Sequence, residues 1–170
     1  MTNPKTIAEP QGECELLVTR EFAAPRELVF RTWTEREHLM NWWGPRTWPL
    51  DYCTVDLRVG GAWHYRMRGP NGEEAWGKGI YKEIARPERL AYDDYFSDAD
   101  GSENPPAMFL AVDFEDRGGK TLLRSKATFA SREHREQVLA MGMVEGLSES
   151  LDRLDEHIEA AVAGAAGGAA

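Results

Sequence analysis

Hydrophobic positions in the first part of the chain follow two different periods. Residues 14–22 mix β-branched and apolar residues with charged ones at a spacing close to two, which predicts a strand. Pro25 suits the first position of a helix, and Leu28, Val29 and Trp33 then follow at helical spacing. We therefore expect a first strand followed by a short helix that ends near residue 33.

A second short helix is expected directly after the first. Thr34 and Glu37 have the spacing of a capping box, in which the threonine oxygen caps the helix start and the glutamate reaches back to the cap. The helix should end near Trp42, because Gly44 permits a helix exit and Pro45 disfavours helical geometry in the residue before it. The two helices should form a bent pair.

A period of two then returns and predicts most of an antiparallel sheet. Together with the first strand, the extended segments give a sheet of six or seven strands, with the later strands at 50–57, 62–68, 74–85, 90–96, 108–115 and 121–129. The intervening stretch 97–106 is rich in loop-forming residues, and is either an ordinary solvated connection or a mobile lid.

Helical spacing dominates the C-terminal part of the chain. Ser131 is placed to cap a helix, and an apolar stripe that includes Leu151 predicts one long helix over residues 132–162. Gly142 and Gly146 fall off this stripe, so they either bend the helix or allow close contact with the rim of the sheet.

This order of elements predicts one α+β domain over residues 14–162. Residues 1–13 are polar and contain two prolines, so we expect a flexible N-terminal tail and not a secretory signal. Residues 163–170 are only alanine and glycine, and we expect a disordered tail.

Alternation along the strands assigns side chains to the two faces of the sheet. Trp63, Tyr65 and Met67 share one face, whereas His64 and Arg66 share the other, so one face should be apolar and meet the long helix.

The next two strands add a hint of a cavity and a buried carboxylate. Gly77 and Gly79 point inward with Tyr81, which marks either space for a ligand or a bulge. Asp94 shares its phase with inward aromatic residues, unless the strand slips and Asp93 takes its place. A buried carboxylate needs a partner, a raised pKa or a ligand.

Net charge, apolar runs and cysteine content exclude some classes of binding partner. The formal net charge of -9 disfavours nucleic acid, whose binding depends on basic patches. No apolar run approaches the roughly twenty residues that span a bilayer. Cys14 and Cys53 are expected to be free thiols, which suits a reducing cytoplasm. We expect a cytoplasmic monomer or homodimer that binds neither nucleic acid nor membrane.

Signatures of several catalytic classes are missing from the sequence. The four histidines, His38, His64, His134 and His157, are spread along the chain without metal-ligand spacing. Neither a glycine-rich phosphate loop nor a Gly-x-Ser-x-Gly elbow is present. The sequence therefore predicts no metal, no cofactor and no catalytic residue.

Three motifs in order carry a family resemblance. They are Trp42-Trp43-Gly44-Pro45, then residues 56–61 with Trp63, and finally Gly142-Met143 followed by residues 151–154. With them, residues 15–160 resemble the domain similar to the C-terminal part of the activator of the ninety-kilodalton heat-shock chaperone's ATPase, in the START-like SRPBCC superfamily. The resemblance implies a helix-grip fold, in which an antiparallel sheet curls around a long C-terminal helix, and an apolar cavity. It also makes a chaperone a candidate partner.

Three hypotheses for function follow. The first is binding of a small, largely apolar molecule between the sheet and the long helix. Its candidate cavity residues are Trp42, Trp43, Tyr52, Trp63, Tyr65, Met67, Tyr81, Asp94 and Met143. The second is an enzyme of the cyclase or hydrolase kind that uses a cavity carboxylate or tyrosine. The third is a chaperone-associated interaction module, which would suit a fully packed core.

Overall fold

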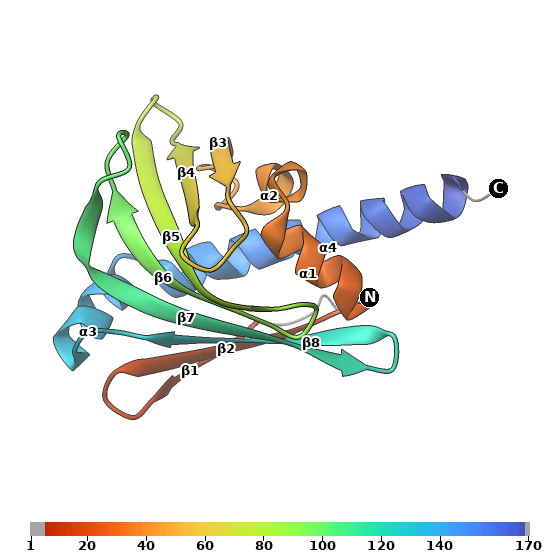
Figure 1. Ribbon diagram of the computed structural model, residues 1–170, viewed down its shortest axis with the longest axis horizontal. Coiled ribbons are helices and arrows are strands. Elements are labelled where there is room, and N and C mark those ends of the chain that lie inside the picture. The colour runs from red at the N-terminus through yellow and green to blue at the C-terminus, as the bar shows by residue number, and fades with distance from the viewer. Residues whose placement is uncertain (1–5, 169–170) are drawn as a thin grey trace.

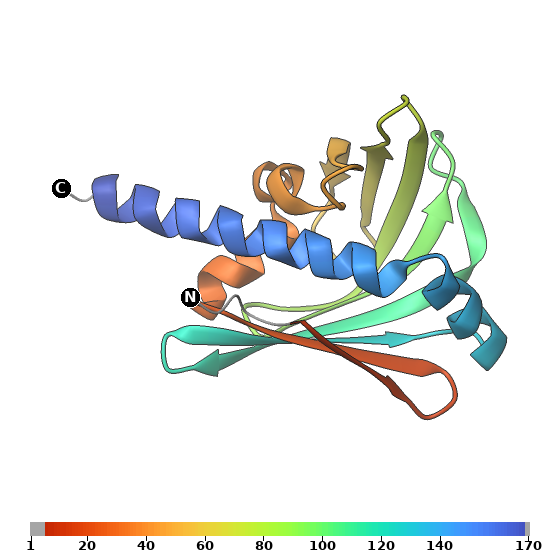
Figure 2. The same cartoon turned by 180° about the vertical axis from the view of Figure 1, so that it is seen from behind.

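The computed structural model describes residues 6–168. One antiparallel sheet curves around a long helix (Figure 1). The eight strands are β1 (Ile7–Gln11), β2 (Glu15–Phe22), β3 (Leu50–Val55), β4 (Ala62–Arg68), β5 (Glu74–Ala85), β6 (Arg89–Ser97), β7 (Glu103–Arg117) and β8 (Lys120–Thr128). The helices are α1 (Arg26–Thr34), α2 (Arg36–Trp42), α3 (Arg132–Ala140) and α4 (Met143–Gly168). Viewed from behind, α4 runs across the concave side of the sheet (Figure 2).

The strand order is β1-β2-β8-β7-β6-β5-β4-β3, and every neighbouring pair is antiparallel. Helices α1 and α2 carry the chain from β2 to β3, which is the strand at the opposite edge. The predicted α+β helix-grip fold is therefore confirmed. The strand count is eight, where the sequence predicted six or seven.

The additional strand lies in the segment predicted to be a flexible tail. β1 pairs antiparallel with β2, with Ala8 opposite Val18. Pro10 is tolerated there because an edge strand has one side that need not donate to the ladder. The prediction of a loose tail is wrong for residues 7–11, and residues 1–5 of that segment lie outside the described residues.

The predicted capping box at the second helix does not form. The Thr34 hydroxyl donates to the carbonyl of Phe30 at 2.9 Å, inside the preceding turn. Glu35 is the N-terminal cap of α2 and makes no side-chain capping bond. Threonine hydroxyls in helices often bond to a carbonyl of the preceding turn, and this bond takes the Thr34 hydroxyl away from the start of α2.

The single long helix predicted over 132–162 is two helices. Gly142 separates α3 from α4 with a φ of +89°, a conformation that glycine adopts readily. The bend is therefore the correct alternative for Gly142. At the other end, α4 continues to Gly168, so residues 163–168 are helical where the sequence predicted a disordered tail, and residues 169–170 of that tail lie outside the described residues. Alanine is the strongest helix former, which explains this extension.

The expected loop 97–106 is shorter than predicted. β7 begins at Glu103, and the turn before it is closed by a hydrogen bond from the Asp98 amide to the Ser102 carbonyl at 3.1 Å. The segment is a hairpin connection between β6 and β7, which is the ordinary alternative and not the lid.

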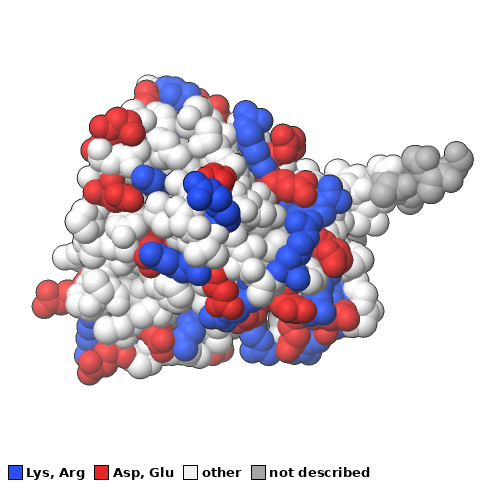
Figure 3. Space-filling model, in the orientation of Figure 1, with Lys and Arg blue, Asp and Glu red and all other residues white. Residues whose placement is uncertain are grey.

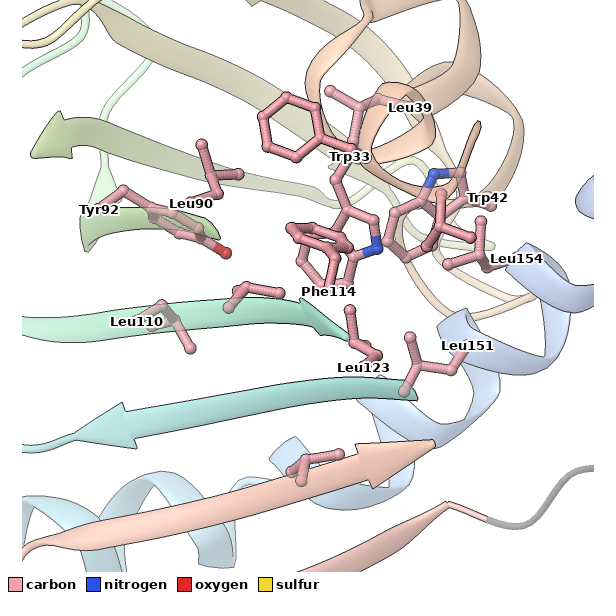
Figure 4. Close-up of a cluster of buried hydrophobic side chains, with 14 of the residues drawn as sticks. Trp33, Leu39, Trp42, Leu90, Tyr92, Leu110, Phe114, Leu123, Leu151 and Leu154 are labelled. Atoms are coloured by element: carbon pink, nitrogen blue, oxygen red, sulfur yellow. The ribbon is translucent and has the colours of Figure 1, made fainter. Parts of the chain in front are cut away.

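The core gathers where α1, α2 and α4 meet the sheet. Trp33, Trp42, Phe114, Leu151 and Leu154 are all at most 2% exposed, and Figure 4 shows them in one cluster. Acidic and basic side chains are interspersed over the surface seen in Figure 3. Within the described residues, every helix is too short or too polar to cross a membrane.

Candidate functional site: a cavity beneath the C-terminal helix

A cavity of about 320 Å³ lies between the concave face of the sheet and the corner formed by α3 and α4. Five residues predicted for the site line it: Trp43, Tyr65, Met67, Asp94 and Met143. Side chains that were not predicted complete most of the wall: Trp33, Pro45, Tyr92, Phe96, Met108, Leu110, Ser125, Val138, Met141, Leu147 and Ser150. The lining is therefore mostly aromatic and aliphatic.

The cavity opens to solvent, and two exposed apolar side chains lie in its lining. Phe96 on β6 is 56% exposed and Met141, in the corner between α3 and α4, is 69% exposed. Large apolar side chains are usually withdrawn from water, so their exposure here marks an entrance that an apolar molecule could cover.

The loop after α2 forms one wall of the cavity. Gly44 has a φ of +94°, and a side chain there would collide with the carbonyl of Trp48. Arg153 on α4 holds this loop by donating to the carbonyls of Gly44 at 2.8 Å and Asn41 at 3.0 Å. This pairing links the motif at residues 42–45 to the motif at 151–154.

Trp43 connects this loop to an aromatic layer on the sheet. Its ring meets Trp63 edge to face, with centroids 4.6 Å apart, and Tyr65 with centroids 5.9 Å apart. Such edge contacts are a favoured aromatic geometry. Trp43 and Tyr65 face the cavity, whereas Trp63 is 1% exposed and supports them from below.

Asp94 is the acidic group of the cavity wall. It lies on β6 opposite Gly79 of β5 and Met108 of β7. Its Oδ1 is buried and has no hydrogen-bond partner among the described residues. Burial raises the pKa of Asp94 from 3.8 to about 7, because a desolvated carboxylate is disfavoured.

The two cavity tyrosines remain neutral beside this carboxyl. Burial, with a further contribution from the charge of Asp94, raises the pKa of Tyr65 and Tyr92 well above the usual value. Their hydroxyls can therefore donate or accept hydrogen bonds, but they cannot supply a second negative charge near neutral pH.

Four predicted site residues lie away from the cavity. Trp42, Trp63 and Tyr81 are core residues, each at most 1% exposed, and the Trp42 indole donates to the carbonyl of Thr32 at 2.8 Å. Tyr52 is on the outer face and is 38% exposed. A bulge between Leu50 and Tyr52 shifts the phase of β3, so Tyr52 lies on the outer face although it is two residues from the buried Leu50.

The inward glycines of β5 make room for side chains of the protein itself. A side chain at Gly77 would overlap the ring of Tyr65, and one at Gly79 would meet Tyr92 at 3.1 Å. β4 and β5 pair without a bulge through these positions. The glycines are therefore explained by close packing of two tyrosines, which neither of the two sequence interpretations anticipated.

Several of the missed lining residues carried a usable signal. Tyr92 and Phe96 share the strand phase of Asp94, so the same alternation could have included them. Val138 and Met141 could not be found from the pattern, because one continuous helix would have placed them differently from the observed bend.

Two histidines that are far apart in the sequence meet in space. His38 on α2 and His157 on α4 share a hydrogen bond of 2.8 Å between Nδ1 and Nε2. Burial and the nearby His38 lower the pKa of His157. Among residues 6–168, no group of three or more His, Cys, Asp or Glu side chains is arranged to hold a metal.

Comparison with solved structures supports the fold. A crystal structure of a Mycobacterium smegmatis protein is 31% identical, covers 91% of this chain and 94% of its own, and superposes with a TM-score of 0.80. A solution structure from Arthrobacter aurescens is 29% identical over 90% of this chain and 91% of its own, with a TM-score of 0.84. A crystal structure from Nitrosomonas europaea is 27% identical over 91% of this chain and 99% of its own, with a TM-score of 0.81.

The family is shown by a direct match over most of the chain. None of the curated proteins matches significantly. A family model described as "Activator of Hsp90 ATPase homolog 1-like protein" matches residues 23–159, which contain α1 through most of α4. The chain therefore belongs to the family of activator of Hsp90 ATPase homolog 1-like proteins.

Proposed function

We propose that the protein binds a small, largely apolar molecule in the cavity beneath α4. The observation that carries this proposal is an open hollow of about 320 Å³ with a mostly aromatic and aliphatic lining. Pockets for small ligands typically start near 300 Å³ and combine an apolar wall with a few polar groups. Here the polar groups are carried by five lining residues: Asp94, Ser125, Ser150, Tyr65 and Tyr92.

A packed interior was the alternative to this hypothesis. Protein cores are normally filled to the density of organic crystals, so an open hollow of this size is not ordinary packing. The chaperone-associated module depended on a filled core, and the cavity does not favour it. A cytoplasmic location and a monomeric or homodimeric state remain parts of the proposal.

A substitution on α4 can fill the cavity without breaking the fold. Gly146 lines the cavity, and an added Cβ would meet only the Pro45 side chain, at 4.0 Å. Gly146→Leu should therefore occupy the hollow and also improve helix propensity. Gly164→Leu is the matched control, because Gly164 is an exposed helical glycine with nothing within 4 Å.

The uncharged dye N-phenyl-1-naphthylamine is a suitable probe for fluorescence titration. Wild type and Gly164→Leu should bind it equally, and Gly146→Leu should bind it roughly tenfold more weakly or worse. Failure of the wild type to bind the dye would refute the proposal, as would equal binding by all three proteins. Native mass spectrometry of the purified protein would identify a natural ligand that remains bound.

Asp94 favours a second candidate, an enzyme that uses the carboxyl as a general acid or base. Its pKa of about 7 suits proton transfer near neutral pH. A molecule that remains bound through purification would be the substrate to test. Wild type should convert it over time and Asp94→Asn should not, whereas an unchanged mass spectrum with wild type would contradict this activity.

A further inference from the structure

The charge of the cavity wall restricts the chemistry of its ligand, and this inference rests on the proposed binding function. Among the described residues that line the cavity, Asp94 is the one side chain that carries a formal charge when ionised at neutral pH. The lining includes no lysine, arginine or histidine from the described part of the chain. A negatively charged ligand group would therefore enter without a counterion.

One oxygen of the Asp94 carboxylate has no hydrogen-bond partner among the described residues. Two other acidic side chains of the sheet are paired: Asp51 accepts from Arg66 at 2.7 Å, and Asp93 lies 3.3 Å from the Lys82 ammonium. Asp94 is one residue from Asp93 on the same strand, yet its buried Oδ1 accepts no bond from the described residues. A buried acceptor without a donor is costly, so a positive charge placed beside this carboxylate in the cavity would be stabilising.

The aromatic side chains of the lining add to the same preference. Trp43, Tyr65, Tyr92 and Phe96 all contribute to the wall that contains Asp94. Aromatic faces carry partial negative charge and attract cations, most strongly where water is excluded. A cation in this cavity would gain from both the carboxylate and the rings, whereas an anion would be repelled by both.

His134 lies in a neighbouring pocket and does not add a positive charge to the cavity lining. A smaller pocket of about 80 Å³ shares Asp94 with the cavity and also contains His134 of α3. The Nδ1 of His134 accepts a hydrogen bond from the amide of Ala130 at 3.1 Å, so that ring nitrogen is already bonded to the backbone. Tyr65 and Tyr92 stay neutral because burial raises the pKa of both.

We propose that the cavity selects an apolar amine: a compact aromatic or cyclic body with one protonated nitrogen that donates to the Asp94 carboxylate. Fatty acids, organic phosphates and other anionic molecules are excluded as ligands of this site. The specificity comes from one unpartnered carboxylate set among aromatic and aliphatic side chains.

Three probes with the same apolar body test this selectivity: 1-naphthylmethylamine, 1-naphthylmethanol and 1-naphthoic acid. Titration calorimetry of the wild type near neutral pH should rank them amine, then alcohol, then acid. The amine should bind roughly tenfold or more tightly than the acid, because a charge-assisted hydrogen bond replaces a like-charge contact. Wild type that binds the acid as tightly as the amine would overturn the proposal without any variant.

Variants then assign the preference to the carboxylate. Asp94→Asn should remove the advantage of the amine over the alcohol, and Asp93→Asn should preserve it, because Asp93 pairs with Lys82 on the other face. Thermal denaturation would check that both variants fold. An amine preference that survives Asp94→Asn would overturn the assignment.

These experiments distinguish a failure of the proposed binding function from a failure of the proposed amine specificity. If no naphthyl probe and no N-phenyl-1-naphthylamine binds, the small-molecule function itself fails. If the alcohol or the acid binds best and Gly146→Leu blocks it, the cavity function stands and the amine specificity is wrong.

Discussion

Ionisation of Asp94 should destabilise the ligand-free protein, and Asp94→Asn measures by how much. Asparagine has nearly the same shape as aspartate but carries no charge, so the change removes the cost of a buried carboxylate. Burial is the cause of the raised pKa, and Oδ1 has no partner among the described residues to offset it. The variant should therefore be more stable than the wild type once the carboxyl is ionised.

The sign and size of the effect follow from proton linkage. Because the folded pKa is above the unfolded one, stability is full below about pH 3.8 and is lost as the pH rises through about 7. The complete loss for a pKa raised from 3.8 to about 7 is roughly 4 kcal/mol. About half of that loss, roughly 2 kcal/mol, falls between about pH 5.5 and about pH 8.5.

Urea denaturation of both proteins at these two pH values gives the comparison. The gap in unfolding free energy between Asp94→Asn and wild type should widen by roughly 2 kcal/mol at the higher pH. Asp93→Asn serves as the control and should show no comparable widening, since Asp93 is paired with Lys82. A gap for Asp94→Asn that does not change with pH would refute the account of a desolvated carboxyl.

Three further predictions test the packing around the cavity. Gly77→Ala should destabilise the protein by about 1 to 3 kcal/mol in urea denaturation, because the new methyl group overlaps the Tyr65 ring. Gly142→Ala should cost about 1 kcal/mol in the same assay, because an L-residue resists the left-handed conformation between α3 and α4. The stability of His157→Gln relative to the wild type should rise as the pH falls below 6.5 in the same assay, because the lowered folded pKa of His157 makes its protonation favour unfolding.

Most of the fold could be predicted because its elements follow regular periods. The boundaries of β4 and β5 match the predicted 62–68 and 74–85, and the apolar face was assigned correctly at Trp63 and Tyr65. β1 was missed because residues 7–11 have little strand character of their own. It forms by pairing with the edge of β2, a long-range effect that local propensity does not contain.

The site was harder to predict than the fold, because some of its residues lie where the regular period of a strand or helix breaks. The bulge at Tyr52 turned that side chain to the outer face, and the bend at Gly142 brought Met141 to the cavity. Trp42 and Tyr81 point inward as alternation and helical spacing indicate, but an inward side chain can lie in the core or beside a hollow. The sequence pattern alone does not distinguish the two.

Two of the three motifs that carry the family resemblance contribute to the cavity lining, through residues 43–45 and through Gly142 and Met143. Gly44 and Gly142 both have φ values near +90°, and each turns the chain at the cavity lining. Arg153 clamps the Gly44 carbonyl to α4, which keeps the loop in place against the helix. These residues build a hollow but bring no charge into it. Asp94 lies outside all three motifs, and the proposed choice of ligand depends on that single carboxylate.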